Sequence, residues 1–143
     1  IQSGRIGIFG HSMGGHGALT LAFKYPEKFV SVSAFAPICA PSQCPWGEKA
    51  FSNYLGEDRA EWAKHDATEL VKAKGALYPD ILIDQGFNDQ FYNQLNPALF
   101  QQACDAVGQK LTLREHQGYD HGYYFIQSFV DDHLQFHAVQ LEN

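Results

Sequence analysis

A short glycine-rich segment near the start of the chain has the residue types of a catalytic serine turn. Residues 10–14 read GHSMG, between an apolar run and a stretch with helical spacing. The glycines allow a sharp turn that exposes the Ser12 hydroxyl, and the following helix directs its N-terminus at the same point. The Met13 N–H is then placed to donate to an oxyanion. We predict a nucleophile elbow; the alternative is a glycine-rich turn with a helix-capping serine.

Asp89 is the candidate for the acid that a serine nucleophile requires. A serine hydroxyl is a poor nucleophile near neutral pH, so it needs a base and an acid that orients the base. In elbow hydrolases the chain order is Ser, acid, His, with the acid just past a strand. Asp89 follows the strand-like run ILID at residues 81–84. Asp84, its rival, lies inside that run and is expected to be structural. The alternative for Asp89 is a solvated loop carboxylate.

His121 is the candidate base. It lies in GYDHG at residues 118–122, after the last strand-like run and before the closing helix. His116 is its main competitor, because it stands closer to the strand end. His11 lies inside the elbow itself, and His16 and His65 precede the acid.

His133 and His137 raise the separate question of a metal site. They are four residues apart beside Asp131 and Asp132, so on a helix they could face one ion. No third ligand pattern supports such a site. We therefore predict a solvated helix face and no metal.

The elements that must position these residues alternate in character. Strand-like runs cover residues 5–9, 29–35, 81–84 and 110–116, and helix-like runs cover 16–25, 67–74, 97–107 and 122–140. The first run is nearly all apolar, which is typical of a strand buried on both faces. For positions 38–65 we expect loops and short helices. The alternation predicts an α/β protein with a parallel sheet and right-handed crossovers, without an internal domain boundary.

Composition bounds the class of protein. Of 143 residues, 45% are apolar and 18% charged, which is typical of a folded domain. The 10 basic and 16 acidic residues give a net charge of −6, so no basic footprint for nucleic acid or anionic lipid exists. Apolar runs are too short for a membrane span. Cys39, Cys44 and Cys104 lack disulfide or zinc spacing, so we predict structural thiols in a reducing compartment.

Eight segments together carry a family resemblance. They are GHSMGGHGA (10–18), FAPIC (35–39), CPWGEKAF (44–51), YLG (54–56), DQG (84–86), GYDH (118–121), YYFI (123–126) and DH (132–133). With them the chain closely resembles the S-formylglutathione hydrolase (esterase D) family of serine thioesterases, which have the α/β-hydrolase fold. The elbow is common to many hydrolases, whereas CPWG and YDH are far more specific. The resemblance covers essentially the whole chain.

The resemblance implies an activity and a site. The family's nucleophile, acid and base fall on Ser12, Asp89 and His121, in agreement with the residue-based choice. The implied reaction is hydrolysis of S-formylglutathione to glutathione and formate, the last step of glutathione-dependent formaldehyde removal. Family members also cleave small esters, are cytoplasmic and usually dimeric, and use no cofactor. Trp46 and Tyr123 are candidates for the substrate pocket, with plain core packing as the alternative.

The sequence departs from the family at two positions and in length. Gly122 stands where serine is expected and Ala40 where asparagine is expected. Family members are about twice as long, so residues 1–143 resemble only their second half, and the opening IQSG lacks an initiator Met. We expect one partial α/β-hydrolase domain of about four parallel strands. The strand at residues 5–9 would then have an unpartnered outer edge, and the second oxyanion donor would lie in a complementary N-terminal half.

Two other functions remain open at this point. The same chemistry could serve a general carboxylesterase, or an acyltransferase related to mycolyl transferases or feruloyl esterases. Alternatively, the chain could be a catalytically incompetent fragment that only binds its complement.

Overall fold

One parallel sheet organises the protein. The computed structural model describes residues 4–142. The strands are β1 (Gly7–His11), β2 (Ser31–Phe35), β3 (Ile81–Gly86) and β4 (Leu111–His116). They pair side by side in the order β1-β2-β3-β4, and every pair is parallel. The predicted α/β class with four parallel strands is therefore confirmed.

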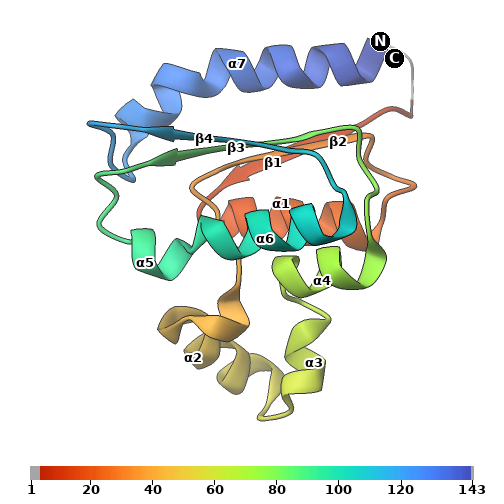
Figure 1. Ribbon diagram of the computed structural model, residues 1–143, viewed down its shortest axis with the longest axis vertical. Helices are drawn as coiled ribbons and strands as arrows, with labels where there is room; N and C mark the ends of the chain where they lie inside the picture. The colour runs from red at the N-terminus through yellow and green to blue at the C-terminus, as the bar shows by residue number, and fades with distance from the viewer. Residues whose placement is uncertain (1–3, 143) are drawn as a thin grey trace.

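Helices cover both faces of the sheet. They are α1 (Met13–Lys24), the 3₁₀ turn η1 (Pro41–Gln43), α2 (Pro45–Leu55), α3 (Arg59–Ala63), α4 (Ala67–Lys74), α5 (Tyr92–Leu95), α6 (Pro97–Val107) and α7 (Tyr123–Glu142). Helix α7 lies alone on one face, while α1, α4 and α6 cover the other (Figure 1). Helices α2 and α3 project beyond α4, away from the sheet. Within residues 4–142, no helix combines the length and apolar character needed to cross a bilayer.

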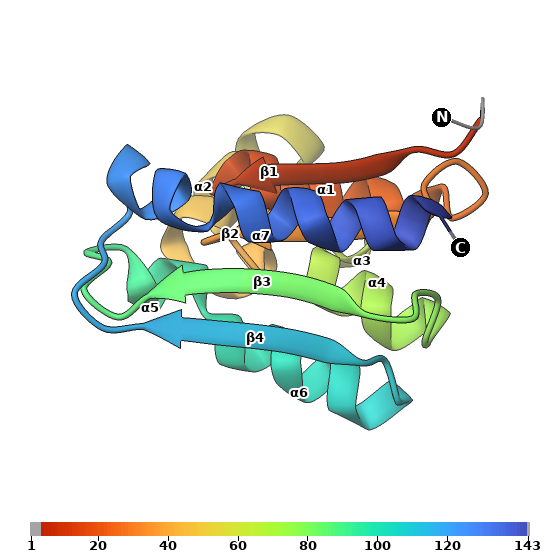
Figure 2. The same ribbon diagram turned by 90° about the horizontal axis from the view of Figure 1, so that it is seen from above.

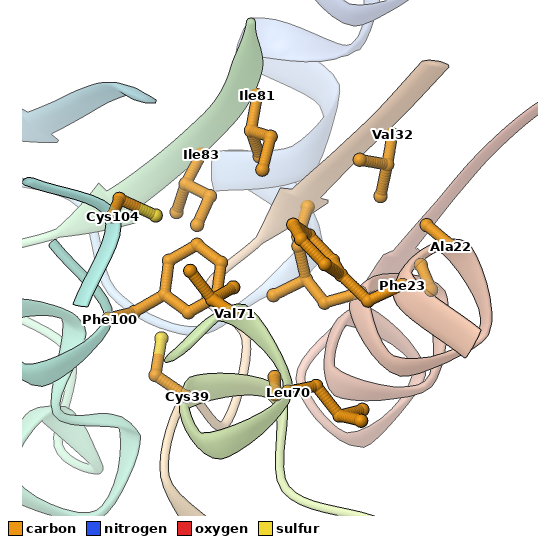
Figure 3. Packing of buried hydrophobic residues seen from close by; sticks show 14 of the residues in the cluster. Ala22, Phe23, Val32, Cys39, Leu70, Val71, Ile81, Ile83, Phe100 and Cys104 are labelled. Carbon is orange, nitrogen blue, oxygen red and sulfur yellow. The ribbon is translucent and has the colours of Figure 1, made fainter. Parts of the chain in front are cut away.

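The main core lies between the sheet and α1, α4 and α6. Ile81 and Ile83 of β3 pack there against Phe23 of α1 and Phe100 of α6 (Figure 3). Cys39 and Cys104 are buried in the same cluster, and Cys44 is buried in a second one. All three cysteines are free thiols, as predicted. Burial raises the pKa of Cys104 to about 12, which keeps this thiol protonated and unreactive.

Helix boundaries follow local signals. Helix α6 has Pro97 in its first turn and ends at Gly108, whose φ of 74° is left-handed. Helix α4 begins after Asp66, whose carboxylate accepts from the Glu69 N–H at 3.2 Å. Both helices occupy their predicted residues. Helix α2, however, has 11 residues where only loops and short helices were expected, and Pro45 begins it.

The prediction that the first strand is buried on both faces is wrong for this chain. Phe9 of β1 is 45% exposed. The reason is position, because β1 is the edge of the four-stranded sheet described here and lacks a neighbour on its outer side. The expectation of an unpartnered β1 edge is met.

The prediction of a solvated face at His133 and His137 is also wrong. Both side chains are buried between α7 and the sheet. His133 bonds Asp84 through Nε2 and Ser33 through Nδ1, each at 2.8 Å. His137 bonds Ser33 through Nε2 at 2.8 Å and Ser31 through Nδ1 at 2.6 Å. These bonds satisfy polar groups that burial would otherwise penalise.

Candidate active site

The three predicted catalytic residues all follow strands at the same edge of the sheet. Ser12 comes directly after β1, Asp89 three residues after β3 and His121 five residues after β4. The strands are parallel, so their carboxyl ends lie at one edge, near the start of α7 (Figure 2). Ligand sites in open parallel sheets form at this edge.

The turn at Ser12 has the strained geometry of a nucleophile elbow. Ser12 has φ 59° and ψ −117°, a conformation that non-glycine residues rarely adopt. Its N–H donates to the Phe35 carbonyl at 2.9 Å, and its own carbonyl accepts from the His16 N–H at 3.0 Å. A Cβ on Gly10 would lie 2.2 Å from the Gly14 carbonyl oxygen, so the turn requires glycine at position 10. The neighbouring backbone thus fixes the strained serine.

Helix α1 leaves its first N–H groups available at this turn. No side chain caps the helix. Met13 is its first residue and is mostly exposed. The first N–H groups of a helix have no partner within the helix and carry its positive dipole end. The Met13 N–H therefore lies at the positive end of α1, in the residue next to Ser12.

Asp89 and His121 form a hydrogen-bonded pair. The distance from His121 Nδ1 to Asp89 Oδ2 is 2.7 Å, and Asp89 is buried. Asp89 also accepts from the Phe91 N–H at 2.8 Å and from the Gln85 amide at 3.0 Å. A carboxylate that accepts all of these bonds leaves the proton on His121 Nδ1, so Nε2 is free to accept one. This is the tautomer that a general base for serine needs.

The loops that carry the acid and the base are bonded to each other. The Asn88 N–H donates to the Tyr119 carbonyl at 3.0 Å, and the Asn88 side chain accepts from the Gly118 N–H at 2.9 Å. A Cβ on Gly86 would come within 2.2 Å of the Tyr119 oxygen, so the loops approach closely only because position 86 is glycine. The backbone itself therefore sets the separation of Asp89 and His121.

His11 contacts the candidate base. Its ring centroid lies 4.5 Å from that of His121, and the Phe91 ring meets His121 edge-on at 5.2 Å. Burial lowers the pKa of His11, and the nearby His121 lowers it further. His11 directly precedes Ser12, so this contact brings β1 and the β4–α7 loop together. The structure has no hydrogen bond between Ser12 and His121 in the described part of the chain; such bonds often tighten only when substrate binds.

The rival residues Asp84 and His116 belong to a different cluster. His116 Nε2 donates to Asp84 at 2.8 Å, and Arg114 donates twice to the same carboxylate, each time at 2.7 Å. Burial by itself would raise the pKa of Asp84, but the bonds from His133, Arg114 and His116 lower it to about 2. Asp84 therefore stays ionised and ties β3 to β4 and α7.

A small cavity opens beside the elbow. Its volume is about 200 Å³, and it is lined by Met13, His16, Ile38, Pro41, Trp46, Gly47, Ala50 and Phe51. The Trp46 ring lies 4.7 Å from the Phe91 ring, which in turn contacts His121, so aromatic contacts connect the cavity to the base. Tyr123, the other predicted pocket residue, is 87% exposed at the start of α7 and does not line this cavity. Residues 4–142 contain no group of three or more potential ligands arranged for a metal ion.

Comparison with known proteins decides the family. The model of a family described as "Putative esterase" matches residues 2–136. The chain belongs to this esterase family. It is 53% identical over 143 residues to S-formylglutathione hydrolase of Arabidopsis thaliana and 55% identical over 139 residues to that of Rattus norvegicus. These alignments cover 99% and 96% of the chain.

A solved structure gives the same result for the fold. An S-formylglutathione hydrolase from Agrobacterium tumefaciens superposes with a TM-score of 0.92 and 55% identity over 96% of this esterase chain. The predicted family resemblance and α/β-hydrolase fold are therefore confirmed. The chain spans about half of each relative: 50% of the Arabidopsis protein, 49% of the rat protein and 50% of the Agrobacterium chain.

Proposed function

We propose that this protein is a serine thioesterase that hydrolyses S-formylglutathione to glutathione and formate. The observation that carries the proposal is the Asp89–His121 hydrogen bond of 2.7 Å at the same sheet edge as the strained turn of Ser12. The names of relatives at 53% and 55% identity support the choice of substrate. The role of the reaction would be the removal of formaldehyde trapped on glutathione.

The proposed reaction proceeds through an acyl-enzyme. His121 Nε2 takes the proton of Ser12 Oγ, and the oxygen attacks the formyl carbonyl. The Met13 N–H donates to the resulting oxyanion, and Asp89 stabilises the imidazolium. Collapse expels glutathione, which receives the proton from His121. Water, activated in turn by His121, then releases formate. Every step uses side-chain or backbone groups, so the proposal includes no cofactor or metal.

Trp46 is proposed to line the acyl or thiol subsite, because it borders the cavity that begins at Met13. We also propose Tyr123 as a pocket residue, because it lies two residues after His121. In the present structure it could reach a substrate only from the outer rim, because its side chain is exposed.

We further propose that residues 1–143 form the second half of one α/β-hydrolase domain and act together with an N-terminal half. Two observations support this: the chain matches half the length of its relatives, and β1 is an apolar edge with Phe9 exposed. The complementary half would pair with β1 and supply the second oxyanion donor. Loss of one such donor costs about 10²–10³ in turnover. We propose a homodimer of the complete protein, and a reducing, cytoplasmic location that suits the three free thiols.

The test uses the chain assembled with the N-terminal half of one of its relatives. Hydrolysis of S-formylglutathione and of a p-nitrophenyl ester is compared for the parent and for Ser12→Ala. The proposal predicts a strong preference for the thioester, which Ser12→Ala abolishes. Equal or better turnover of the aryl ester would favour the general carboxylesterase, and thioester turnover by Ser12→Ala would refute the serine mechanism. Activity in neither assay would leave the incompetent fragment as the correct description.

A further inference from the structure

Gln85 is a buried amide directly behind the candidate acid. It is the penultimate residue of β3, and its side chain is 0% exposed. The Nε2 group donates to Asp89 Oδ2 at 3.0 Å and to the Gly86 carbonyl at 3.1 Å. Its Oε1 atom is buried and has no hydrogen-bond partner within residues 4–142. A side chain with one unsatisfied buried atom is an unfavourable choice for packing alone.

The contacts of Asp89 show what this amide contributes. Asp89 Oδ2 receives two donors, Gln85 and His121, while Oδ1 receives the Phe91 N–H. A carboxylate held at one oxygen can still turn about its Cβ–Cγ bond. With Gln85 on one oxygen and a backbone N–H on the other, the carboxylate plane is fixed before His121 engages it. The shared oxygen is thereby aimed at the ring.

Gln85 can hold Asp89 rigidly because it lies on a central strand of the sheet. Strand β3 pairs with β2 on one side and with β4 on the other, and all six of its residues are buried. The next residue, Gly86, is the point at which the loop leading to His121 packs against the strand. One strand end therefore positions the acid through the Gln85 side chain and the base through the close approach at Gly86.

We propose that Gln85 is a positioning residue that holds the Asp89 carboxylate in the orientation in which it receives the His121 Nδ1–H. The proposal rests on the proposed serine hydrolase function and adds to it a residue that acts through Asp89 without touching substrate. Sequence position alone gives no hint of this role, because Gln85 lies inside a strand.

The test compares Gln85→Met with Gln109→Met in the assembled enzyme. Methionine keeps the length and burial of glutamine but removes the amide. Gln109 is the matched control, because it is also buried and its amide bonds Leu77, Tyr78 and Lys110 near the opposite ends of β3 and β4. We expect Gln85→Met to lower kcat for a p-nitrophenyl ester about tenfold with little change in KM. Gln109→Met should lower stability and leave kcat per folded molecule unchanged.

A double-substitution cycle tests whether Gln85 acts through the acid. In an Asp89→Asn background, Gln85→Met should have almost no further effect on kcat, because the carboxylate that it positions is gone. Full additivity, or equal kcat values for Gln85→Met and the parent, would overturn the proposal. A fall in kcat for Gln109→Met equal to that of Gln85→Met would also overturn it, since any buried amide would then serve.

A spectroscopic readout separates this proposal from the proposed function. The Nδ1–H proton of His121 should give a downfield NMR signal that disappears in Asp89→Asn and shifts or broadens in Gln85→Met. This signal needs no substrate. If the protein cleaves no thioester or ester but the signal responds to Gln85→Met, the proposed function fails and the positioning role stands. If it hydrolyses S-formylglutathione and neither the signal nor kcat responds to Gln85→Met, the positioning role fails alone.

Discussion

His137 should make the protein lose stability as the pH falls from 7.5 to 4.5. Its ring is buried under α7, with Nε2 bonded to Ser33 at 2.8 Å and Nδ1 bonded to Ser31 at 2.6 Å. The Ser33 hydroxyl also bonds His133, whose other nitrogen bonds Asp84. Because Asp84 only accepts, these bonds are all satisfied when both rings are neutral. Burial, together with a smaller contribution from the nearby His133, lowers the pKa of His137 to about 4.

The sign and size of the effect follow from proton linkage. The unfolded chain takes up a proton at His137 near pH 6.5, whereas the folded protein resists it until about pH 4. The free energy of unfolding that the neutral ring contributes is therefore complete above pH 6.5. It is lost as the pH falls from 6.5 to about 4. At pH 4.5 the loss is about 2–3 kcal/mol, a large part of a typical total of about 5–15 kcal/mol. The carboxylate of Asp84, with a pKa of about 2, remains ionised at pH 4.5.

The assay is urea unfolding of the parent and of His137→Gln at pH 7.5 and pH 4.5. Glutamine can bond both serines but does not titrate in this range. We expect the variant to be less stable than the parent at pH 7.5. Between pH 7.5 and pH 4.5, its free energy of unfolding should fall by about 2–3 kcal/mol less than that of the parent. His16, whose pKa burial lowers to about 4, adds a similar dependence to both proteins and cancels in the comparison. Equal pH dependence in parent and variant would refute the reasoning.

Four further substitutions have outcomes set by the structure. Gly10→Ala places a Cβ 2.2 Å from the Gly14 carbonyl oxygen and should abolish labelling of Ser12 by a fluorophosphonate probe. Gly14→Ala has open space around its Cβ and should be labelled at the parent rate. Equal labelling rates for the two variants would contradict this. Phe100→Ala should lower the unfolding free energy by about 3–5 kcal/mol in urea titrations, since the ring is fully buried, and a loss below about 1 kcal/mol would argue against that packing. Asp84→Asn breaks the paired bonds with Arg114 and should cost about 3–5 kcal/mol at pH 7, measured in the same way; an unchanged midpoint would show that the cluster is not stabilising.

Local chemistry made much of the fold predictable. Helix α6 is bounded by Pro97 and Gly108, and helix α4 occupies the predicted residues 67–74. The GHSMG turn could be placed because only a few residue types permit a serine at φ 59° between a strand and a helix. Asp89 and His121 could be chosen from their places after strands. The hydrogen bond between Asp89 and His121 could not be predicted in the same way, because it depends on contacts between two loops that are far apart in the sequence.

Other features depend on tertiary contacts that local patterns do not encode. The exposure of Phe9 follows from the neighbours of β1, not from its own residues. The prediction of a solvated face at His133 and His137 rests on the lack of a third metal-ligand pattern, which carries no information about what packs against the helix. One signal could have corrected this: with Phe125 and Phe129 they form a series with a spacing of four, which marks one face of a helix.

The central claim is that Ser12 is an activated nucleophile, and labelling with a fluorophosphonate tests it most directly. The chain is treated with the probe, with and without an N-terminal half, and analysed by native mass spectrometry and peptide mapping. We predict one probe per chain on Ser12, in a complex heavier than the 16.0 kDa chain, and none on Ser12→Ala. A chain that assembles with its complement and remains unlabelled, or that carries the probe on another residue, would contradict it.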